Sequence, residues 1–549
     1  FVPLWGSEQF GVNCNLYVHE NSWLVVDLGM GFADEKLPGV DILLPDIDYL
    51  INNREKISAL IITHAHEDHI GAVPYLWPKL KCPIYCTKFT ANALRSKFRE
   101  FPQCKSAEIH EIAAGDQLEI GAFDVEFINM AHSIPETVAL YIESSSQEVS
   151  AFHSADWNLD PKPVIGKQTN IQTLKKIAKK GVTAYIGDST NAIFPGRAGS
   201  ESDVETGLDK VVAECEGKII ITLFASNIAR IQSICRAAKN NNRSVAVLGR
   251  SLHNMIACAK QAGYLRDIPD FVEEDDISLI PDENLIVIAT GSQGEPRAAM
   301  SRIARGDWQG IRLGKNDAVI FSSREIPGNE KDIEHIKNML IDSGVQIIDP
   351  NNASGKIHVS GHPYRDEIYD MLTILNPKSV IPVHGEHVQL SGQVEVAKGC
   401  GIKDIQMPVN GSVIRITKDQ GVEITGYVPT GLLAVEPKRV VKVDHKGIRE
   451  RRKLQFSGVL HASIALNRRG DLVTEPMINT VGLFDEDHKG DTDIAADLEN
   501  EIVEILEDMT DEEVQDDHFV SEQLRIGLRR FVRGVLDFKP VTTIHVMRV

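Results

Sequence analysis

The chain has 549 residues, of which 42% are hydrophobic, and none of its apolar runs approaches the roughly eighteen residues that a membrane-spanning helix needs. Its net charge of −20 argues against an evenly basic surface, although residues 485–517 alone carry sixteen acidic side chains and one lysine. Because the eight cysteines form no CxxC pair, we expect reduced thiols in a cytoplasmic protein, with roughly two to four domains.

The first informative element is a predicted buried strand at Ser58–Ile62, which is followed closely by His64-Ala65-His66-Glu67-Asp68-His69. Three imidazoles and neighbouring carboxylates predict a metal site, and this mixture of ligands suits Zn²⁺, with Mn²⁺ as the harder alternative. Adjacent side chains point apart, so two neighbouring ions fit this cluster better than one. The alternative is a histidine-rich surface loop, which is disfavoured because solvated loops seldom follow a buried strand of this kind.

Several other apolar stretches also end in residues that can bind a metal. Trp23–Val26 leads into Asp27, Val125–Ile128 into His132, Val149–Phe152 into His153 and Asp156, and Ser379–Val383 into His384. Taken singly, each would more often be a buried core histidine or a capping aspartate. Several of them converging on one sheet edge favour a shared site.

Between about residues 200 and 355 the pattern changes to alternating strands and helices without a metal motif. Strands are expected at Lys218–Thr222, Val245–Leu248 and Leu285–Ile288, and helices at Asn227–Ala238 and Ser251–Ala262. This alternation predicts a doubly wound unit inserted into the metal-bearing fold. Ser226 and Asn227 open a helix whose amides could bind a phosphate, and Arg250 could pair with another. Ordinary helix capping is the alternative for Ser226.

The last part of the chain predicts a return to the core and then a small separate domain. The core resumes with His362, a helix around Ile368–Leu375, and His384, after which the basic stretch Lys438–Lys453 is interpreted as a linker. Beyond it we expect strands at Val459–Leu466 and Thr542–Met547, and helices at Asp493–Met509 and near Glu522–Leu536.

Together these motifs resemble a known family. The cluster His64–His69, with Asp27, His132 and Asp156 in order, is similar to the metallo-β-lactamase superfamily. Further stretches resemble the β-CASP nucleases and, among them, the bacterial ribonuclease J family: Gly187–Asn191, Phe224–Ile228, Thr290–Pro296, Ile326–Glu330, His358–His362 and Pro382–Glu386. The resemblance covers nearly the whole chain, more loosely over its last hundred residues or so.

This resemblance implies an α/β fold with several parts. A metallo-β-lactamase αββα sandwich would occupy residues 1–200 and 356–437, with a doubly wound β-CASP insertion at 201–355 between them. A linker at 438–455 would lead to a small α+β oligomerisation domain at 456–549. The resemblance also implies a homodimer or homotetramer that binds single-stranded RNA and no membrane.

By position, the resemblance also implies the ligands of two zinc ions per chain, with manganese as the alternative. With Asp156 bridging the two ions, the expected ligands are His64, His66 and His132 for one ion, and Asp68, His69 and His384 for the other. Asp27 is expected to support the metal-binding loop through hydrogen bonds.

The implied chemistry is phosphodiester hydrolysis assisted by two metal ions. Asp68 would also receive a proton from the attacking water, and His362, oriented by Asp188, would donate to the scissile phosphate or to the leaving 3′-oxygen. A structural Asp188 that caps the turn before Pro195 is the alternative.

His358, Ser360 and His362 resemble the family's pocket for a 5′-monophosphate, with turn formation as the alternative for Ser360. The pocket implies 5′-to-3′ exonuclease action beside single-strand endonuclease action, in RNA processing and decay. A β-CASP nuclease acting on DNA and a catalytically inactive RNA-binding scaffold are the alternatives. One departure concerns Arg230, which stands where many relatives carry a histidine, so the substrate contact made by that side chain in the relatives is not assumed here.

The acidic segment 485–517 is expected to form a solvated face or a flexible tract. Repulsion of RNA from the wrong surface and docking of a basic partner are the alternatives. A nuclease needs only a locally basic channel and its metal ions, so the net charge does not exclude one.

Overall fold

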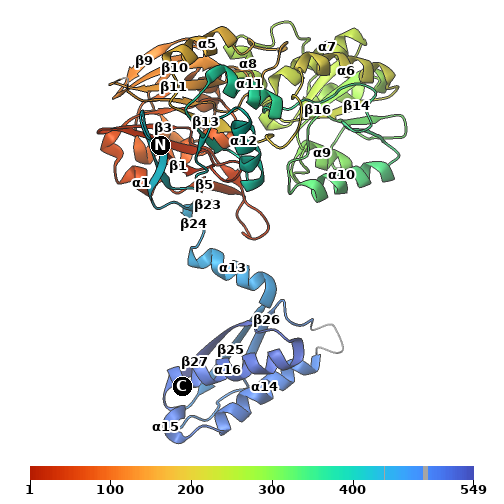
Figure 1. Cartoon of the computed structure of the whole chain (residues 1–549). Coiled ribbons are helices and arrows are strands. Elements are labelled where there is room, and N and C mark those ends of the chain that lie inside the picture. The colour runs from red at the N-terminus through yellow and green to blue at the C-terminus, as the bar shows by residue number, and fades with distance from the viewer. Residues whose placement is uncertain (147, 438, 486–491) are drawn as a thin grey trace. The chain divides into compact units, whose positions relative to one another are not determined.

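A computed structural model describes residues 1–146, 148–437, 439–485 and 492–549 (Figure 1). The described chain divides into two compact units, one formed by Phe1–Gly31 and Leu43–Leu432 and the other by Phe32–Ile42 and Leu433–Val549. Part of the predicted acidic segment, residues 486–491, lies outside the described residues.

Two sheets form the core of the first unit. The first sheet, in the order β1-β2-β3-β6-β7-β8, contains β1 (Val2–Trp5), β2 (Cys14–His19), β3 (Ser22–Val26), β6 (Ile57–Ile61), β7 (Ile84–Thr87) and β8 (Ile109–Ile112). The second, in the order β20-β19-β13-β12-β11-β10-β9, contains β9 (Gln117–Ile120), β10 (Phe123–Asn129), β11 (Val138–Ser144), β12 (Ser150–His153), β13 (Ala184–Asp188), β19 (Ser379–Val383) and β20 (Asp404–Ile405).

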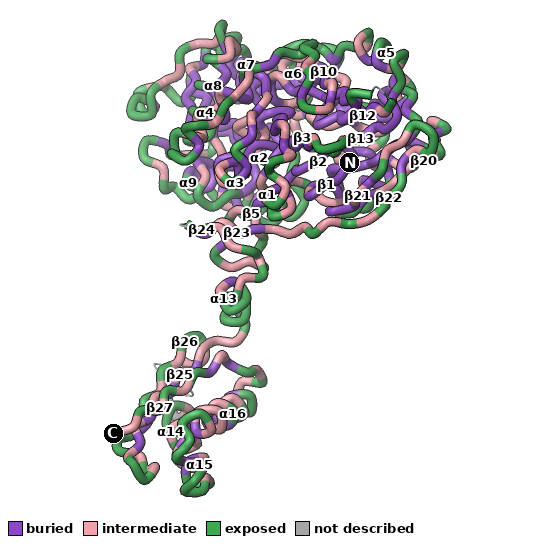
Figure 2. Tube along the Cα trace, turned by 90° about the vertical axis from the view of Figure 1, so that its left-hand side faces the viewer, coloured by how far each residue is buried: buried purple, intermediate pink, exposed green. Residues whose placement is uncertain are grey.

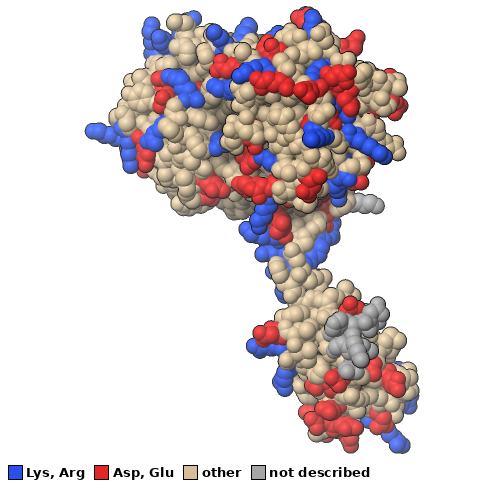
Figure 3. Space-filling view, turned by 90° about the vertical axis from the view of Figure 1, so that its right-hand side faces the viewer, with Lys and Arg blue, Asp and Glu red and all other residues tan. Residues whose placement is uncertain are grey.

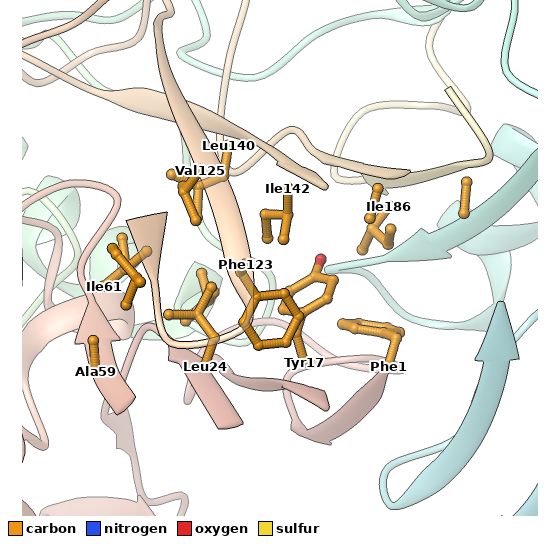
Figure 4. Packing of buried hydrophobic residues seen from close by; sticks show 14 of the residues in the cluster. Phe1, Tyr17, Leu24, Ala59, Ile61, Phe123, Val125, Leu140, Ile142 and Ile186 are labelled. Atoms are coloured by element: carbon orange, nitrogen blue, oxygen red, sulfur yellow. The ribbon is translucent and has the colours of Figure 1, made fainter. Parts of the chain in front are cut away.

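Apolar side chains on the inner faces join the two sheets. Leu24 and Ile61 from the first sheet share one buried cluster with Val125 and Leu140 from the second (Figure 4). The hairpin of β21 (Ser412–Thr417) and β22 (Gly421–Tyr427) adds further buried residues to this cluster. Because alternate residues of a strand face the same side, the inner faces are apolar and the polar groups gather where the strands end.

Helices lie against the outer faces. On the first sheet's side these are α1 (Asp48–Ile51), α2 (Glu67–Ile70), α3 (Val73–Leu80) and α4 (Lys88–Phe98), and on the second sheet's side α5 (Ile171–Lys180), α11 (Arg365–Leu375) and α12 (His387–Gly399). Leu174 of α5 and Leu372 of α11 pack with Tyr185 of the second sheet in another buried cluster. The predicted αββα sandwich is therefore confirmed, and its buried strands stand out in Figure 2.

The insertion is a parallel sheet between two layers of helices. Its order is β15-β16-β14-β17-β18, with β14 (Ile219–Thr222), β15 (Ser244–Leu248), β16 (Leu285–Ala289), β17 (Ala318–Phe321) and β18 (Gln346–Ile348). Helices α6 (Glu201–Glu214) and α7 (Ile228–Asn240) lie on one side in Figure 1, and α9 (Ala299–Ala304) and α10 (Glu330–Asp342) on the other, while α8 (Arg250–Ala262) follows β15. The predicted doubly wound insertion is confirmed.

Short elements complete the first unit and its boundary. They are the strands β4 (Gly31–Phe32) and β5 (Ile42–Pro45) and the 3₁₀ turns Arg54–Lys56, Pro102–Cys104, Glu274–Leu279 and Asp282–Asn284. All eight cysteines lie in the described residues and are free, as the sequence predicted.

The second unit is a small α+β domain, as predicted. Its sheet, in the order β26-β25-β27, contains β25 (Val459–Leu466), β26 (Met477–Val481) and β27 (Val541–Arg548), with β25 and β27 parallel. Helices α14 (Thr492–Glu507) and α16 (Asp517–Leu536) bury Leu498 and Leu524 against Leu460 of this sheet. Acidic side chains gather on this unit in Figure 3, whereas acidic and basic side chains are mixed on the first.

Some elements of the second unit were not predicted. Helix α13 (Lys446–Ser457) forms within the stretch interpreted as a linker, and Arg451 from it binds Glu436. The hairpin of β23 (Leu432–Glu436) and β24 (Arg439–Lys442), the short helix α15 (Asp511–Val514) and the strand β26 also went unpredicted. In β26, the apolar residues Met477 and Val481 are exposed on an edge strand. The strand therefore has no buried apolar face whose alternating pattern could be recognised in the sequence.

Candidate metal centre

The predicted metal residues converge where strands of the two sheets end. Asp27 follows β3, the His64–His69 cluster follows β6, and Asp156 and His384 follow β12 and β19. The short helix α2 begins at Glu67, directly after His66, and carries Asp68 and His69. Although 316 positions separate them in sequence, His384 Nε2 lies 3.3 Å from Asp68 Oδ2.

Among the described residues, three groups of side chains could hold a metal ion, and two of these groups share one carboxylate. The ligand atoms within each group all lie within 4.8 Å of one another, and these two groups are His64, His66, His132 and Asp156, and Asp68, His69, Asp156 and His384. Asp156 Oδ2 lies 3.6 Å from His64 Nε2 and 3.3 Å from His69 Nε2. The structure thus brings together all seven predicted ligands in the expected division, with Asp156 between the two groups.

Most of the histidines in this cluster have a protein partner on their outer nitrogen. The contacts are His69 Nδ1 to Asp27 Oδ2 at 2.7 Å, His132 Nδ1 to the Gly361 carbonyl at 2.7 Å, His384 Nδ1 to Thr190 Oγ1 at 2.9 Å and His64 Nδ1 to Thr63 Oγ1 at 3.0 Å. When Nδ1 donates to these oxygens, Nε2 keeps a free lone pair directed into the cluster. His66 instead presents Nδ1, which lies 3.1 Å from Nε2 of His64 and of His132.

The electrostatics of the cluster also suit a divalent cation. Burial lowers the pKa of His132 to about 3 and that of His66 to about 4, so both imidazoles are neutral. Burial alone would raise the pKa of Asp156, but His384 and His69 hold it well below its usual range. Neutral imidazoles and ionised carboxylates are the donor forms that zinc requires, and His66, His132 and Asp156 already have these forms. Although burial alone would lower the pKa of His69 and His384, Asp156 and the neighbouring carboxylates raise it well above its usual range, so these two rings would lose a proton on binding a metal. With that proton released, the residues present fit a metal site.

Asp27 supports the cluster from a buried position. Its carboxylate accepts hydrogen bonds from the Thr63 amide at 2.8 Å and from the Thr63 hydroxyl, in addition to the bond from His69. The backbone of Asp27 has a φ of 63°, a left-handed conformation that is costly for a residue with a side chain. Two residues further along the chain, Gly29 lies so close to the backbone of Asp68 that an added Cβ would be 1.6 Å from the Asp68 carbonyl oxygen.

His362 and Asp188 lie beside the two groups. His362 Nδ1 is 2.8 Å from Asp188 Oδ2, and His362 Nε2 is 3.9 Å from Asp156 Oδ2. Asp188 also accepts a hydrogen bond from the Thr190 amide at 2.8 Å. Asp188 therefore makes a local turn contact, as the alternative suggested, and contacts His362 as well.

The residues proposed for phosphate contacts are placed less uniformly. Ser360 Oγ accepts hydrogen bonds from Asn191 Nδ2 at 2.8 Å and from the His362 amide at 3.1 Å, so it lies beside the centre. His358 is half-buried, and burial lowers its pKa to about 3 with the help of Arg230 and Arg324.

The remaining candidates belong to the helices of the insertion. Asn227 Oδ1 accepts from the Arg230 amide at 2.9 Å, which is the capping contact, and Ser226 precedes it at a half-buried position. Arg250 begins α8 and is exposed, and no hydrogen bond or ion pair in the described structure joins it to Ser360 or His362.

Comparison with known proteins agrees with this architecture. Family models match as "Metallo-beta-lactamase superfamily" at 8–128, "Ribonuclease J, beta-CASP domain" at 216–340, "Zn-dependent metallo-hydrolase RNA specificity domain" at 355–408 and "Ribonuclease J C-terminal domain" at 446–549. A ribonuclease J of Sinorhizobium meliloti is 37% identical over 554 residues, which cover 100% of this chain and 97% of the relative. The chain belongs to the ribonuclease J family.

Other relatives of this ribonuclease J family member are consistent with that assignment. Proteins named ribonuclease J from Mycolicibacterium smegmatis and Thermus thermophilus are 31% and 33% identical, covering 100% and 84% of this chain and 97% and 81% of their own lengths. A crystal structure of a protein of unknown function from Enterococcus faecalis V583 matches with a TM-score of 0.52 at 16% identity, covering 74% of this chain and 97% of that one. This last likeness concerns the fold alone.

The family and fold predicted from the motifs are therefore confirmed, and the family descriptions imply a bound metal. Within the described part of this ribonuclease J family member, none of the helices combines the length and the apolar character needed to span a membrane.

Sequence reasoning missed several partners of the centre in this ribonuclease J family member. Asn13 Nδ2 lies 3.1 Å from both the Asp68 carbonyl and His69 Nε2, and Thr63 contacts Asp27 and His64. Thr190 and Asn191 lay within a motif that the sequence did single out, so a signal existed for them. Asn13 and Thr63 carried no comparable signal, because asparagine and threonine are common near strand ends.

Proposed function

We propose that this chain hydrolyses phosphodiester bonds of single-stranded RNA at the candidate metal centre. In this proposal it acts as a 5′-to-3′ exonuclease that prefers a 5′-monophosphate, and also as an endonuclease. The observation that carries the proposal is the pair of ligand groups that share Asp156. Membership of the ribonuclease J family supports RNA as the substrate.

The proposed site holds two zinc ions, with manganese as the alternative metal. One ion would be held by His64, His66 and His132 and the other by Asp68, His69 and His384, with Asp156 shared. Support comes from the directed ring nitrogens, the neutral imidazoles of His66 and His132 and the buried ionised carboxylate of Asp156. When bound, two divalent ions lower the pKa of water and neutralise charge on the phosphodiester.

Asp68 is the proposed proton acceptor for the attacking water. Its side chain is 31% exposed, whereas the side chain of Asp156 is 3% exposed, so Asp68 is the carboxylate that water and substrate can reach. His69 and His384 hold its pKa well below the usual range against the effect of burial, so it is ionised at neutral pH. An ionised carboxylate in that position can hold and accept the proton of a water molecule.

His362 is the proposed proton donor. Burial alone would lower its pKa, but Asp188 and Asp156 raise it, which favours the protonated ring. With Nδ1 held by Asp188, Nε2 faces the centre and can donate to the scissile phosphate or to the leaving 3′-oxygen. The products would then carry a 5′-phosphate and a 3′-hydroxyl.

Recognition of the 5′ end is assigned to His358, Ser360 and His362. Ser360 supports this role most directly, because its hydroxyl is held between Asn191 and the His362 amide beside the centre. Ser226, Asn227 and Arg250 remain weaker candidates, since Asn227 is engaged in helix capping.

The proposal also includes an oligomeric state and a cellular location for the protein. A homodimer or homotetramer is what the resemblance to the family implies for the C-terminal domain at 446–549. RNA processing and decay in the cytoplasm would follow from the family.

One assay tests the function. Purified protein receives 5′-labelled RNAs of one sequence that carry a monophosphate, a triphosphate or a hydroxyl, beside a matched single-stranded DNA. We expect labelled mononucleotide from the monophosphate RNA, and endonucleolytic fragments from the other RNAs. Equal cleavage of the DNA would overturn the proposed substrate, and failure to cleave any RNA with zinc or manganese present would overturn the function.

A further inference from the structure

Arg324, which follows β17 in the insertion, is an oriented cation beside the metal centre. Its guanidinium lies 4.3 Å from the centroid of the Phe194 ring, and its Nη1 donates to Asn191 Oδ1 at 3.1 Å. The residue is exposed, and within the described residues no salt bridge to a carboxylate is found for it. A guanidinium has five N–H donors, so this arrangement leaves most of them available.

A short chain of hydrogen bonds links Arg324 to the proposed catalytic residues. Asn191, which accepts from Arg324, donates through Nδ2 to Ser360 Oγ at 2.8 Å and to the His362 carbonyl at 3.3 Å. One residue thus connects Arg324 with both the predicted 5′-phosphate pocket and the predicted proton donor.

The neighbouring arginine has a different role. Arg230 is fully buried and binds both carboxylate oxygens of Glu201, at 2.6 and 3.0 Å. Its charge is therefore compensated within the core. Arg324, in contrast, is exposed and contacts a neutral ring and a neutral amide.

A buried glutamine from the Thr290–Pro296 motif binds the backbone on both sides of Glu325. Gln293, in the Thr290–Pro296 motif, donates through Nε2 to the Arg324 carbonyl at 2.9 Å and accepts from the Ile326 amide at 2.8 Å. Gln293 is buried, so these bonds are shielded from water. The Phe194 ring also contacts Tyr364, with the two ring centroids 5.7 Å apart. Both the side chain and the backbone of Arg324 thus have specific partners within the protein.

We propose that Arg324 binds a phosphate group of the RNA strand next to His362. The inference rests on the proposed function and adds a residue to its substrate contacts. The planar fork of an arginine matches the oxygens of a phosphate, and stacking on Phe194 reduces the entropy lost on binding. The ligand is either the 5′-terminal phosphate or a phosphodiester within the strand.

Binding of RNA without cleavage tests this proposal. The affinity of a 2′-O-methyl single-stranded RNA is measured for the full chain, for Arg324→Ala and Arg324→Lys, and for the control Arg236→Ala. Arg236 is an exposed arginine of the same insertion, but it is paired with Glu205. We expect Arg324→Ala to weaken binding about 10- to 100-fold, Arg324→Lys to weaken it less, and Arg236→Ala to leave it unchanged.

The salt dependence separates a phosphate contact from a structural effect. Loss of one contact to a single strand should reduce the slope of log Kd against log salt concentration by about 0.7. Unchanged affinity in Arg324→Ala, or weaker binding with an unchanged slope, would overturn the proposal.

A comparison of RNAs with two different 5′ ends identifies which phosphate Arg324 contacts. A loss confined to the 5′-monophosphate RNA assigns the contact to the terminal phosphate, and an equal loss with the 5′-hydroxyl RNA assigns it to a phosphodiester. Because binding is read without hydrolysis, a failure of the proposed enzymatic function would appear in the cleavage assay of the unchanged chain and would be distinguishable.

Discussion

Asp188 accepts a hydrogen bond of 2.8 Å from Nδ1 of His362, and this contact determines which nitrogen of that ring faces the metal centre. The other oxygen of Asp188 accepts from the Thr190 hydroxyl at 2.6 Å, and that hydroxyl in turn lies 2.9 Å from His384 Nδ1. One buried carboxylate thus connects the proposed proton donor with a proposed metal ligand on a different strand end.

Asp188→Asn should reduce kcat by about 100-fold or more and change KM little. The amide can no longer stabilise the imidazolium form of His362, and general acid catalysis typically contributes a factor of that size. Steady-state kinetics of Asp188→Asn, His362→Gln and the double variant check this, together with the metal content of each. Residues that act as one unit give losses that do not add. A double variant much slower than either single variant would contradict the pairing.

Asp68→Ala and His69→Ala should each lower turnover by about 10³-fold or more while leaving the fold largely intact, because neither side chain belongs to the apolar clusters between the sheets. Turnover is measured beside circular dichroism. Glu67→Ala is the matched control, since Glu67 occupies the same short helix but pairs with Lys97 at 2.5 Å. Activity retained in either centre variant, or lost equally in the control, would contradict the ligand assignment.

The part of the site that the sequence could predict consists of residues with distinctive chemistry. His64–His69 concentrate imidazoles and carboxylates at a strand end, and that pattern is typical of a metal site. Asp156 and His384 could be placed because each also follows an apolar strand and matches a family motif. Their convergence in the structure depends on how strands β12 and β19 lie beside β13 in one sheet, which is a property of the whole fold.

The supporting contacts could not be predicted, for physical reasons. His132 is oriented by the carbonyl of Gly361. Because every residue has a backbone carbonyl, the sequence does not indicate which carbonyl will make this contact. Asn227 illustrates a different limit, since an asparagine that caps a helix and one that binds a phosphate look alike in sequence. The fold was more predictable than these contacts, because its strands and helices carry their apolar periodicity locally.

Removal of the metal by a chelator should abolish hydrolysis and leave the secondary structure in place. The two sheets are joined by a large apolar cluster, so the fold does not depend on the ions alone. Thermal unfolding should shift to lower temperature, because a ligand that binds only the folded state stabilises it by mass action. Metal analysis should find two ions per chain, and zinc or manganese should restore activity. A chain that binds RNA but no metal would instead support the scaffold alternative.

Asp27→Ala should cost about 2–4 kcal/mol of unfolding free energy and weaken metal binding by about 10- to 100-fold. The change leaves the buried Thr63 amide and His69 Nδ1 without their acceptor, and partners of ligating histidines typically affect affinity by that factor. Urea unfolding of the metal-free chain and a zinc titration measure the two effects separately. Unchanged zinc affinity would contradict the supporting role of Asp27.

Arg230→Met should destabilise the chain by about 3–5 kcal/mol, because it leaves the Glu201 carboxylate without its partner. Arg230 also donates to the Ser322 carbonyl at 2.6 Å and to the Ile357 carbonyl at 3.0 Å, so it joins α7 to the segment that carries His358. The double variant Arg230→Met with Glu201→Leu should recover part of this loss, since an apolar pair carries no buried charge. Urea unfolding of the two single variants and the double variant measures the coupling. Independent, additive losses would show that the two side chains do not stabilise the insertion as a pair.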